Sequence, residues 1–131
     1  MRTHFHTRLL SFSHALYLLF GGGWPLLHLK SFEEVTGPKH DEFLVRTVAL
    51  LLILVGSILL GQRKAAVERS AVQLAMGTSF ILGTVAIVSA AGGWVWKVYF
   101  IDGTIHLLFV LAWAFLLFRG AVSLYPRTAV R

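Results

Sequence analysis

Four apolar stretches, each long enough to cross a lipid bilayer, dominate this chain of 131 residues. They cover about residues 9–29, 43–61, 70–91 and 96–118. A hydrocarbon core is roughly 30 Å thick, so a helix that rises about 1.5 Å per residue needs about 20 apolar residues to span it. Because lipid offers no hydrogen bonds to the backbone, each stretch is predicted to be an α-helix. The sequence therefore predicts an all-α integral membrane protein, a four-helix bundle in a single membrane domain.

Composition agrees with a membrane protein and excludes several other classes. Of all residues 56% are hydrophobic and 14% are charged, whereas soluble domains average about 25% charged. The absence of cysteine excludes disulfides, iron–sulfur clusters and thiolate zinc sites. The net charge of +6 comes from basic residues scattered at the predicted helix ends, where they suit anionic headgroups. No basic module points to nucleic acid, so the expected partner is the lipid bilayer.

The last apolar stretch holds the most informative polar residues. Asp102 and His106 stand four apart within it, which places both on one face of a helix. Ionisable groups are costly in hydrocarbon, so they mark functional sites by default. Two alternatives stay open. Asp102 could cap a helix that starts later, leaving Trp94 to Ile101 at the interface, and His106 could be an imidazole that serves packing only.

The first apolar stretch contains a Gly-Gly-Gly-Trp-Pro run at 21–25. Pro25 has no amide proton for the helical ladder, and it disfavours helical angles at Trp24. We therefore expect a kink or a short unwound piece there, with Trp24 at the membrane interface. A cleaved signal peptide is the alternative for this stretch, but His14 and Tyr17 in its apolar part argue against it.

A polar loop at 30–42 separates the first two predicted spans. Ser31 and Glu34 have the spacing of a capping box for one helical turn, and Gly37 would end that turn. Pro38 suits the first position of the following helix.

The distribution of charge predicts the orientation in the membrane. With four spans, the N-terminus, the 62–69 turn and the tail share one side, which holds eight of the twelve basic residues and a single acid, Glu68. The positive-inside rule then places both termini in the cytoplasm, as for a protein of the plasma or bacterial inner membrane. The eight basic residues are Arg2, Arg8, Arg63, Lys64, Arg69, Arg119, Arg127 and Arg131.

Small residues recur every four positions along the third stretch, at Ala71, Ala75, Ser79 and Gly83. Such a small-residue stripe lets helices approach closely in lipid. It could pack within the chain, or against a second copy or a partner membrane protein. The second case would make the protein a structural or accessory subunit that oligomerises through its third helix and holds no ligand.

The main functional prediction is an outward-facing polar pocket that binds an ion or a small apolar or amphipathic molecule, in a role related to transport. An acidic vestibule would concentrate cations, and aromatic side chains would suit an apolar molecule. No residue set indicates a catalysed reaction. The predicted ligand-binding residues are Asp102, His106, His28, Trp24, Glu33, Glu34 and Asp41.

The sequence leaves the cofactor open. Asp102 and His106, with His28 and Glu33 or Glu34, could supply hard ligands for a divalent metal, although the spacing matches no specific zinc or calcium signature. For a haem with two histidine ligands the pair would be His14 and His106. Their predicted depths in the membrane differ by about 7 Å, which argues against haem.

The run S-F-E-E-V-T-G-P-K-H-D-E-F-L-V-R-T-V at 31–48, with G-G-W-P-L-L-H at 22–28, resembles a group of small bacterial four-span membrane proteins of unassigned function. The resemblance covers roughly residues 17–50 and, more loosely, 99–106. It implies no activity and no cofactor. It does imply that the segment from 24 to 46 is functional rather than a passive loop.

Overall fold

The computed structural model describes residues 2–62 and 67–120, and this part of the chain forms five α-helices and no strand. Three of the helices, α3, α4 and α5, are long and apolar enough to cross a membrane. The prediction of an all-helical chain is confirmed, and these three helices match the spans predicted at 43–61, 70–91 and 96–118. The helices are α1 (Arg2–Leu27), α2 (Leu29–Thr36), α3 (Glu42–Gly61), α4 (Arg69–Ala91) and α5 (Val98–Phe118).

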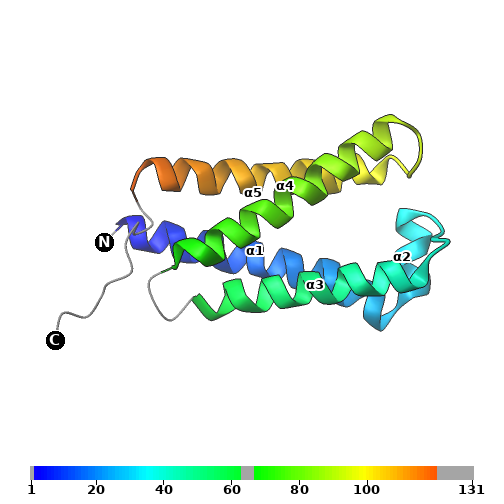
Figure 1. The fold of residues 1–131 in the computed structure, drawn as a ribbon, viewed down its shortest axis with the longest axis horizontal. Coiled ribbons are helices and arrows are strands. Elements are labelled where there is room, and N and C mark those ends of the chain that lie inside the picture. The colour runs from blue at the N-terminus through cyan, green and yellow to red at the C-terminus, as the bar shows by residue number, and fades with distance from the viewer. Residues whose placement is uncertain (1, 63–66, 121–131) are drawn as a thin grey trace.

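The long helices are arranged as two antiparallel pairs (Figure 1). Helix α1 packs along α3, and α4 packs along α5, while contacts between the pairs run from α3 to α4 and from α1 to α5. The short α2 folds back on α1 and also reaches α5. The start of α1 and the end of α5 lie at the same end of the molecule. We call the other end, which contains α2 and residues 92–97, the α2 end.

Small residues bring α1 and α3 close together at two places. A Cβ atom on Gly22 would run into the carbonyl oxygen of Ala49, and one on Gly56 would lie 3.1 Å from the carbonyl oxygen of Ala15. Both contacts are seven residues apart on each helix, so they lie about two turns apart on one face. Glycine at these positions is what allows the two backbones to pack in contact.

The small-residue stripe of α4 is buried inside the structure. Ala71, Ala75, Ser79 and Gly83 are all buried, and a Cβ on Gly83 would lie 3.0 Å from the carbonyl oxygen of Gly103 in α5. The stripe therefore packs within the chain. An oligomer or a partner protein stays a prediction, and its interface would need a surface other than this stripe.

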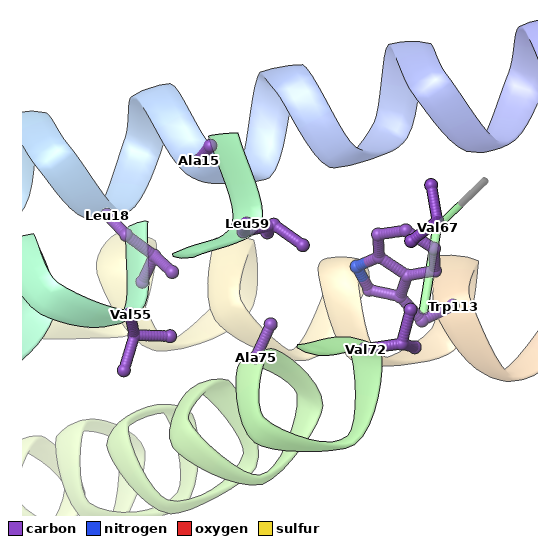
Figure 2. Packing of buried hydrophobic residues seen from close by; sticks show 8 residues of the cluster. All are labelled: Ala15, Leu18, Val55, Leu59, Val67, Val72, Ala75 and Trp113. Atoms are coloured by element: carbon purple, nitrogen blue, oxygen red, sulfur yellow. The ribbon is translucent and has the colours of Figure 1, made fainter. Parts of the chain in front are cut away.

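A cluster of buried apolar side chains holds the two helix pairs together (Figure 2). It combines residues from the middle of α1, the second half of α3, the first half of α4 with Val67 just before it, and the last turns of α5, and Trp113 is its largest fully buried side chain. The cluster consists of Ala15, Leu18, Val55, Leu59, Val67, Val72, Ala75 and Trp113.

The helix predicted within the 30–42 loop is present, but its start was predicted wrongly. Helix α2 begins at Leu29, and its cap is His28, whose Nδ1 accepts a hydrogen bond of 3.2 Å from the amide of Ser31. The expected capping box of Ser31 and Glu34 does not form, because the Ser31 hydroxyl donates to the carbonyl of His28. Gly37 ends the helix as predicted, with a φ of 89°.

The start of the next helix was also predicted wrongly. Helix α3 begins at Glu42 rather than at Pro38. Asp41 precedes it as the cap, and its Oδ1 accepts a hydrogen bond of 3.0 Å from the amide of Leu44. A carboxylate cap accepts a hydrogen bond from a free amide of the first turn, so the helix starts directly after Asp41.

Helix α1 continues through the Gly-Gly-Gly-Trp-Pro run, so the predicted unwound piece is absent. The helix includes Pro25 and ends at Leu27, where the amide of His28 still donates to the carbonyl of Trp24 at 2.9 Å.

Part of the basis for the predicted orientation lies outside the described residues. This holds for the turn after Gln62 and for the polar tail, and thus for the basic residues Arg63, Lys64, Arg127 and Arg131.

Candidate functional site

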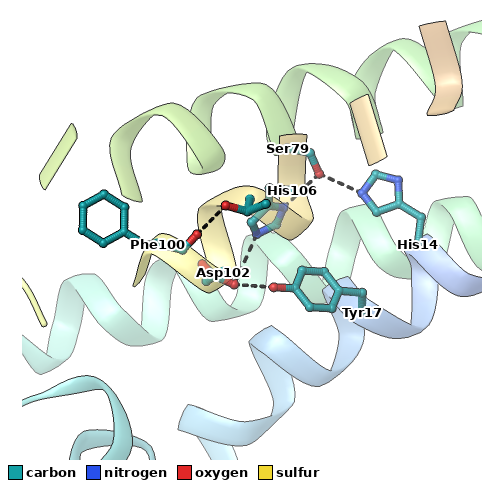
Figure 3. Close-up of polar contacts among 7 residues, drawn as sticks. His14, Tyr17, Ser79, Phe100, Asp102 and His106 are labelled. Carbon is teal, nitrogen blue, oxygen red and sulfur yellow. Dashed lines mark hydrogen bonds and ion pairs between the residues drawn. The ribbon is translucent and has the colours of Figure 1, made fainter. Parts of the chain in front are cut away.

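A chain of interacting polar side chains joins α1, α4 and α5 (Figure 3). At one end, the Tyr17 hydroxyl donates to Oδ1 of Asp102. The Nε2 atom of His106 lies 3.8 Å from the same oxygen, and its Nδ1 atom lies 3.0 Å from the hydroxyl oxygen of Ser79. The predicted pair Asp102 and His106 thus lies in one site, and two further helices complete it.

The chain continues beyond Ser79 to a second imidazole. The Nε2 atom of His14 lies 2.7 Å from the Ser79 hydroxyl oxygen, so this one hydroxyl contacts both histidines. On the far side of the ring, the indole N–H of Trp113 donates to Nδ1 of His14 at 3.1 Å. Every step from Trp113 to Ser79 is a hydrogen bond between side chains.

The chain of polar side chains is buried except at the carboxylate of Asp102. His14 and Ser79 are fully buried and His106 is 4% exposed, whereas the side chain of Asp102 is 42% exposed. Within the part of the protein that the structure describes, no buried side-chain nitrogen or oxygen lacks a hydrogen-bond partner. Among the described residues of the site, the carboxylate of Asp102 is thus the polar group that a ligand can contact, on the side toward the α2 end.

Aromatic contacts hold the two imidazoles in place. The ring of Phe109 stacks on His14 with 4.3 Å between the centroids and 10° between the planes. Tyr17 meets His106 edge to face at 5.1 Å, and its ring lies 5.6 Å from Phe109. Packing of this kind restricts ring rotation, so the hydrogen-bonding geometry is set in advance.

On α5 the site residues form one stripe. Asp102, His106, Phe109 and Trp113 follow one another at steps of four, three and four residues, which keeps them on one helix face. The alternative in which Asp102 caps this helix is wrong, because α5 starts at Val98 and Asp102 lies inside it. Sequence reasoning identified the first two residues of the stripe and missed Trp113, although the spacing pointed to it.

On α1 a second polar stripe faces inward, and sequence reasoning did not recognise it. Thr7, Ser11 and His14 are buried, and Tyr17 follows at the same helical spacing. The Ser11 hydroxyl donates to the carbonyl of Leu59 in α3 at 3.0 Å. The signal in the sequence was the recurrence of polar residues every three or four positions in an apolar helix.

The other predicted site residues lie at the α2 end and have local contacts there. His28 and Asp41 cap α2 and α3, and the Trp24 indole donates to the Ser31 hydroxyl at 2.9 Å. Glu33 accepts a hydrogen bond of 2.8 Å from the amide of Lys39. Glu34 is exposed on α2. None of these contacts reaches Asp102, and a part in ligand binding stays a prediction for all five.

Lys39 ties the loop after α2 to the start of α5, a contact that sequence reasoning missed. Its ammonium donates to the carbonyls of Thr36 and Gly37 at 2.9 and 2.6 Å, and lies 5.2 Å from the centroid of the Tyr99 ring. Partial burial lowers the pKa of Lys39, and the nearby Glu33 carboxylate opposes this effect. The Lys39 ammonium is thus bound to these carbonyl groups, and it forms no ion pair with Asp102.

The geometry does not assemble the metal or haem sites that the sequence left open. Among the described residues no three His, Asp or Glu side chains gather as a metal ion would require. Both ring nitrogens of His14 have hydrogen-bond partners, and those of His106 face Ser79 and Asp102. The imidazoles of His14 and His106 both contact the Ser79 hydroxyl group, which takes the position between them that a haem iron would need.

A separate apolar groove of about 330 Å³ lies on the outer face of α1. Trp24 is the one predicted site residue in its lining, and neither Asp102 nor His106 contributes to it. The apolar groove and the site around Asp102 are therefore two separate features of the surface. The groove is lined by Leu19, Phe20, Gly23, Trp24 and Leu27.

Comparison with protein-family models, with curated proteins and with solved structures finds no match. The bacterial group that the sequence resembles stays a prediction, and the function is argued from the geometry of the site.

Proposed function

We propose that the chain is a membrane protein with four spans and cytoplasmic termini, and that Asp102 binds a small cation that enters from the outer, α2 end. The observation that carries this proposal is the half-exposed carboxylate of Asp102 at the open end of a buried polar chain. The site supports the binding of the cation. Transport would also require the release of the cation on the other side of the membrane.

The surface of α1 supports a fourth span, in addition to the three helices of spanning length. Large apolar residues on it, such as Leu16 and Phe20, are exposed, while polar Ser11 and His14 are fully buried. Water would favour the opposite arrangement. In lipid, exposed apolar and internally bonded polar side chains are the stable one. At 26 residues the helix is also long enough to cross the hydrocarbon core.

The charge of the site supports a cation as ligand. Oδ1 of Asp102 is occupied by Tyr17 and faces His106, while Oδ2 accepts no hydrogen bond from any described residue. No lysine or arginine in the described part of the chain forms an ion pair with this carboxylate. An ionised carboxylate in a low-dielectric surrounding requires a counter-charge. A cation from solution can supply it through the exposed side.

The charges at the two ends support the direction of entry. The α2 end carries four acids in α2 and at the start of α3, which offset the four basic residues Lys30, Lys39, Arg46 and Lys97, so this end is close to neutral before Asp102 is counted. The opposite end carries Arg8, Arg69 and Arg119, as expected for a cytoplasmic face. The acids at the α2 end are Glu33, Glu34, Asp41 and Glu42.

Replacing Asp102 with asparagine is expected to lower the affinity for a small cation by about tenfold or more, because the charge is lost while Oδ1 stays available to Tyr17. Isothermal titration of the purified protein with sodium, potassium and methylammonium chloride measures this affinity. Glu68→Gln, which removes an exposed carboxylate at the opposite end of the molecule, is the matched control and should bind as the unaltered protein does. Equal affinities in Asp102→Asn and Glu68→Gln, or no binding by the unaltered protein, would refute the proposal.

A further inference from the structure

The buried end of the polar chain is an indole, and this determines the protonation of the residue beside it. An indole N–H can donate a hydrogen bond but cannot accept one. Since Trp113 points its N–H at Nδ1 of His14 from 3.1 Å, that nitrogen must be the acceptor. Neutral His14 then carries its single proton on Nε2, the atom that faces Ser79.

The same reasoning extends along the chain to Asp102. With Nε2–H of His14 donating to the Ser79 hydroxyl oxygen, the hydroxyl hydrogen is free to point at Nδ1 of His106, 3.0 Å away. When the hydroxyl donates to this nitrogen, neutral His106 carries its proton on Nε2, and that N–H faces Oδ1 of Asp102 from 3.8 Å. In this arrangement the donors from Trp113 onward all point toward the carboxylate.

We propose that Trp113 is a positioning residue that sets the tautomers of both buried histidines, presents an N–H to Asp102 and closes the inner end of the chain to protons. The inference rests on the proposed cation site and deepens it. With both imidazoles neutral, they place no positive charge beside the Asp102 carboxylate, so the site favours a cation over an anion.

Proton movement along the chain is limited to one side of the membrane. A second proton on His14 would have to sit on Nδ1, where the Trp113 N–H already points. The indole nitrogen itself accepts no proton, so no hop leads past His14. Toward the α2 end the polar chain reaches the partly exposed Asp102, so this is the side on which it meets solvent.

The tautomers can be read directly by nitrogen NMR of the full chain in lipid bilayers, with ¹⁵N-labelled histidine and tryptophan. We expect a protonated Nε2 and an unprotonated Nδ1 for both buried histidines. Ring contacts identify them, since His14 stacks on Phe109 and His106 meets Tyr17. We also expect a scalar coupling between the Trp113 indole nitrogen and Nδ1 of His14 across their hydrogen bond.

Trp113→Phe keeps an aromatic ring but removes the N–H. The ratio of Nε2–H to Nδ1–H tautomers at His14 should fall roughly fivefold, the factor that corresponds to one ordinary hydrogen bond. A change of the same direction should appear at His106, transmitted through Ser79. The matched control is Trp94→Phe, because Trp94 is 77% exposed and is not a member of the chain of polar side chains. It should leave both ratios unchanged.

An Nδ1–H tautomer on either buried histidine in the unaltered protein would overturn the inference, and so would an unchanged ratio in Trp113→Phe. If that variant does not fold, the tautomers and the scalar coupling of the unaltered protein decide the question alone. The tautomers are measured without a cation present. A failed cation titration would therefore count against the proposed function and leave the tautomer result standing.

Discussion

Gly103→Ala is expected to destabilise the protein by about 1–3 kcal/mol, the range for overpacking a closely packed site. The new Cβ would lie 2.7 Å from Cγ1 of Ile87 and 2.9 Å from the carbonyl oxygen of Gly83. The carbonyl belongs to a helix backbone, so the clash is relieved only if α4 and α5 move apart. Reversible denaturation by SDS in mixed micelles measures the change in the free energy of unfolding.

Gly77→Ala in α4 provides the matched control for this prediction. A Cβ on Gly77 would meet nothing within 4 Å. Alanine also favours the helix over glycine by up to about 1 kcal/mol, so this variant should be neutral or slightly more stable. If the two variants unfold at the same denaturant fraction, α4 and α5 do not approach as closely as Gly83 and Gly103 indicate.

Ser79→Ala is expected to lower the free energy of unfolding by about 2–6 kcal/mol. One oxygen serves both buried histidines, at 2.7 Å from His14 and 3.0 Å from His106. Its removal leaves two buried ring nitrogens without a partner, and each such group costs about 1–3 kcal/mol. The same denaturation experiment reports the loss.

Ser57→Ala removes a hydroxyl of the same kind from an exposed position in α3 and should change stability by less than about 0.5 kcal/mol. A similar small effect for Ser79→Ala would show that the hydroxyl does not hold the two imidazoles together.

The sequence by itself determined three apolar spans and two members of the site. Bilayer thickness fixes the length of an apolar helix, so the spans of α3, α4 and α5 could be predicted within two residues at each end, whereas α1 starts at Arg2, seven residues before the predicted span. Asp102 and His106 were identifiable because charged groups stand out in an apolar run. Gly37 was identifiable as a helix end because its positive φ suits glycine. Each of these features depends on neighbours in the sequence alone.

The choice among local caps was not determined in this way. Ser31 and His28 both offer a side chain to the start of α2, and sequence preference favours serine. The structure uses His28, because the Ser31 hydroxyl is engaged with the Trp24 indole and the His28 carbonyl. The competing hydrogen bonds come from residues that the fold brings together, and spacing does not reveal them.

Only the tertiary structure decided what surrounds Asp102 and His106. The partner of the carboxylate, Tyr17, lies 85 positions away in the sequence, and the indole of Trp113 bonds to His14 across 99 positions. Such pairings depend on how α1 packs against α4 and α5, and helix packing in lipid is set by close contact between small residues rather than by a local signal. The sequence therefore showed that Asp102 and His106 share one face of an apolar helix, while the packing of the helices decided that Tyr17, Ser79 and His14 join them in one chain of polar contacts.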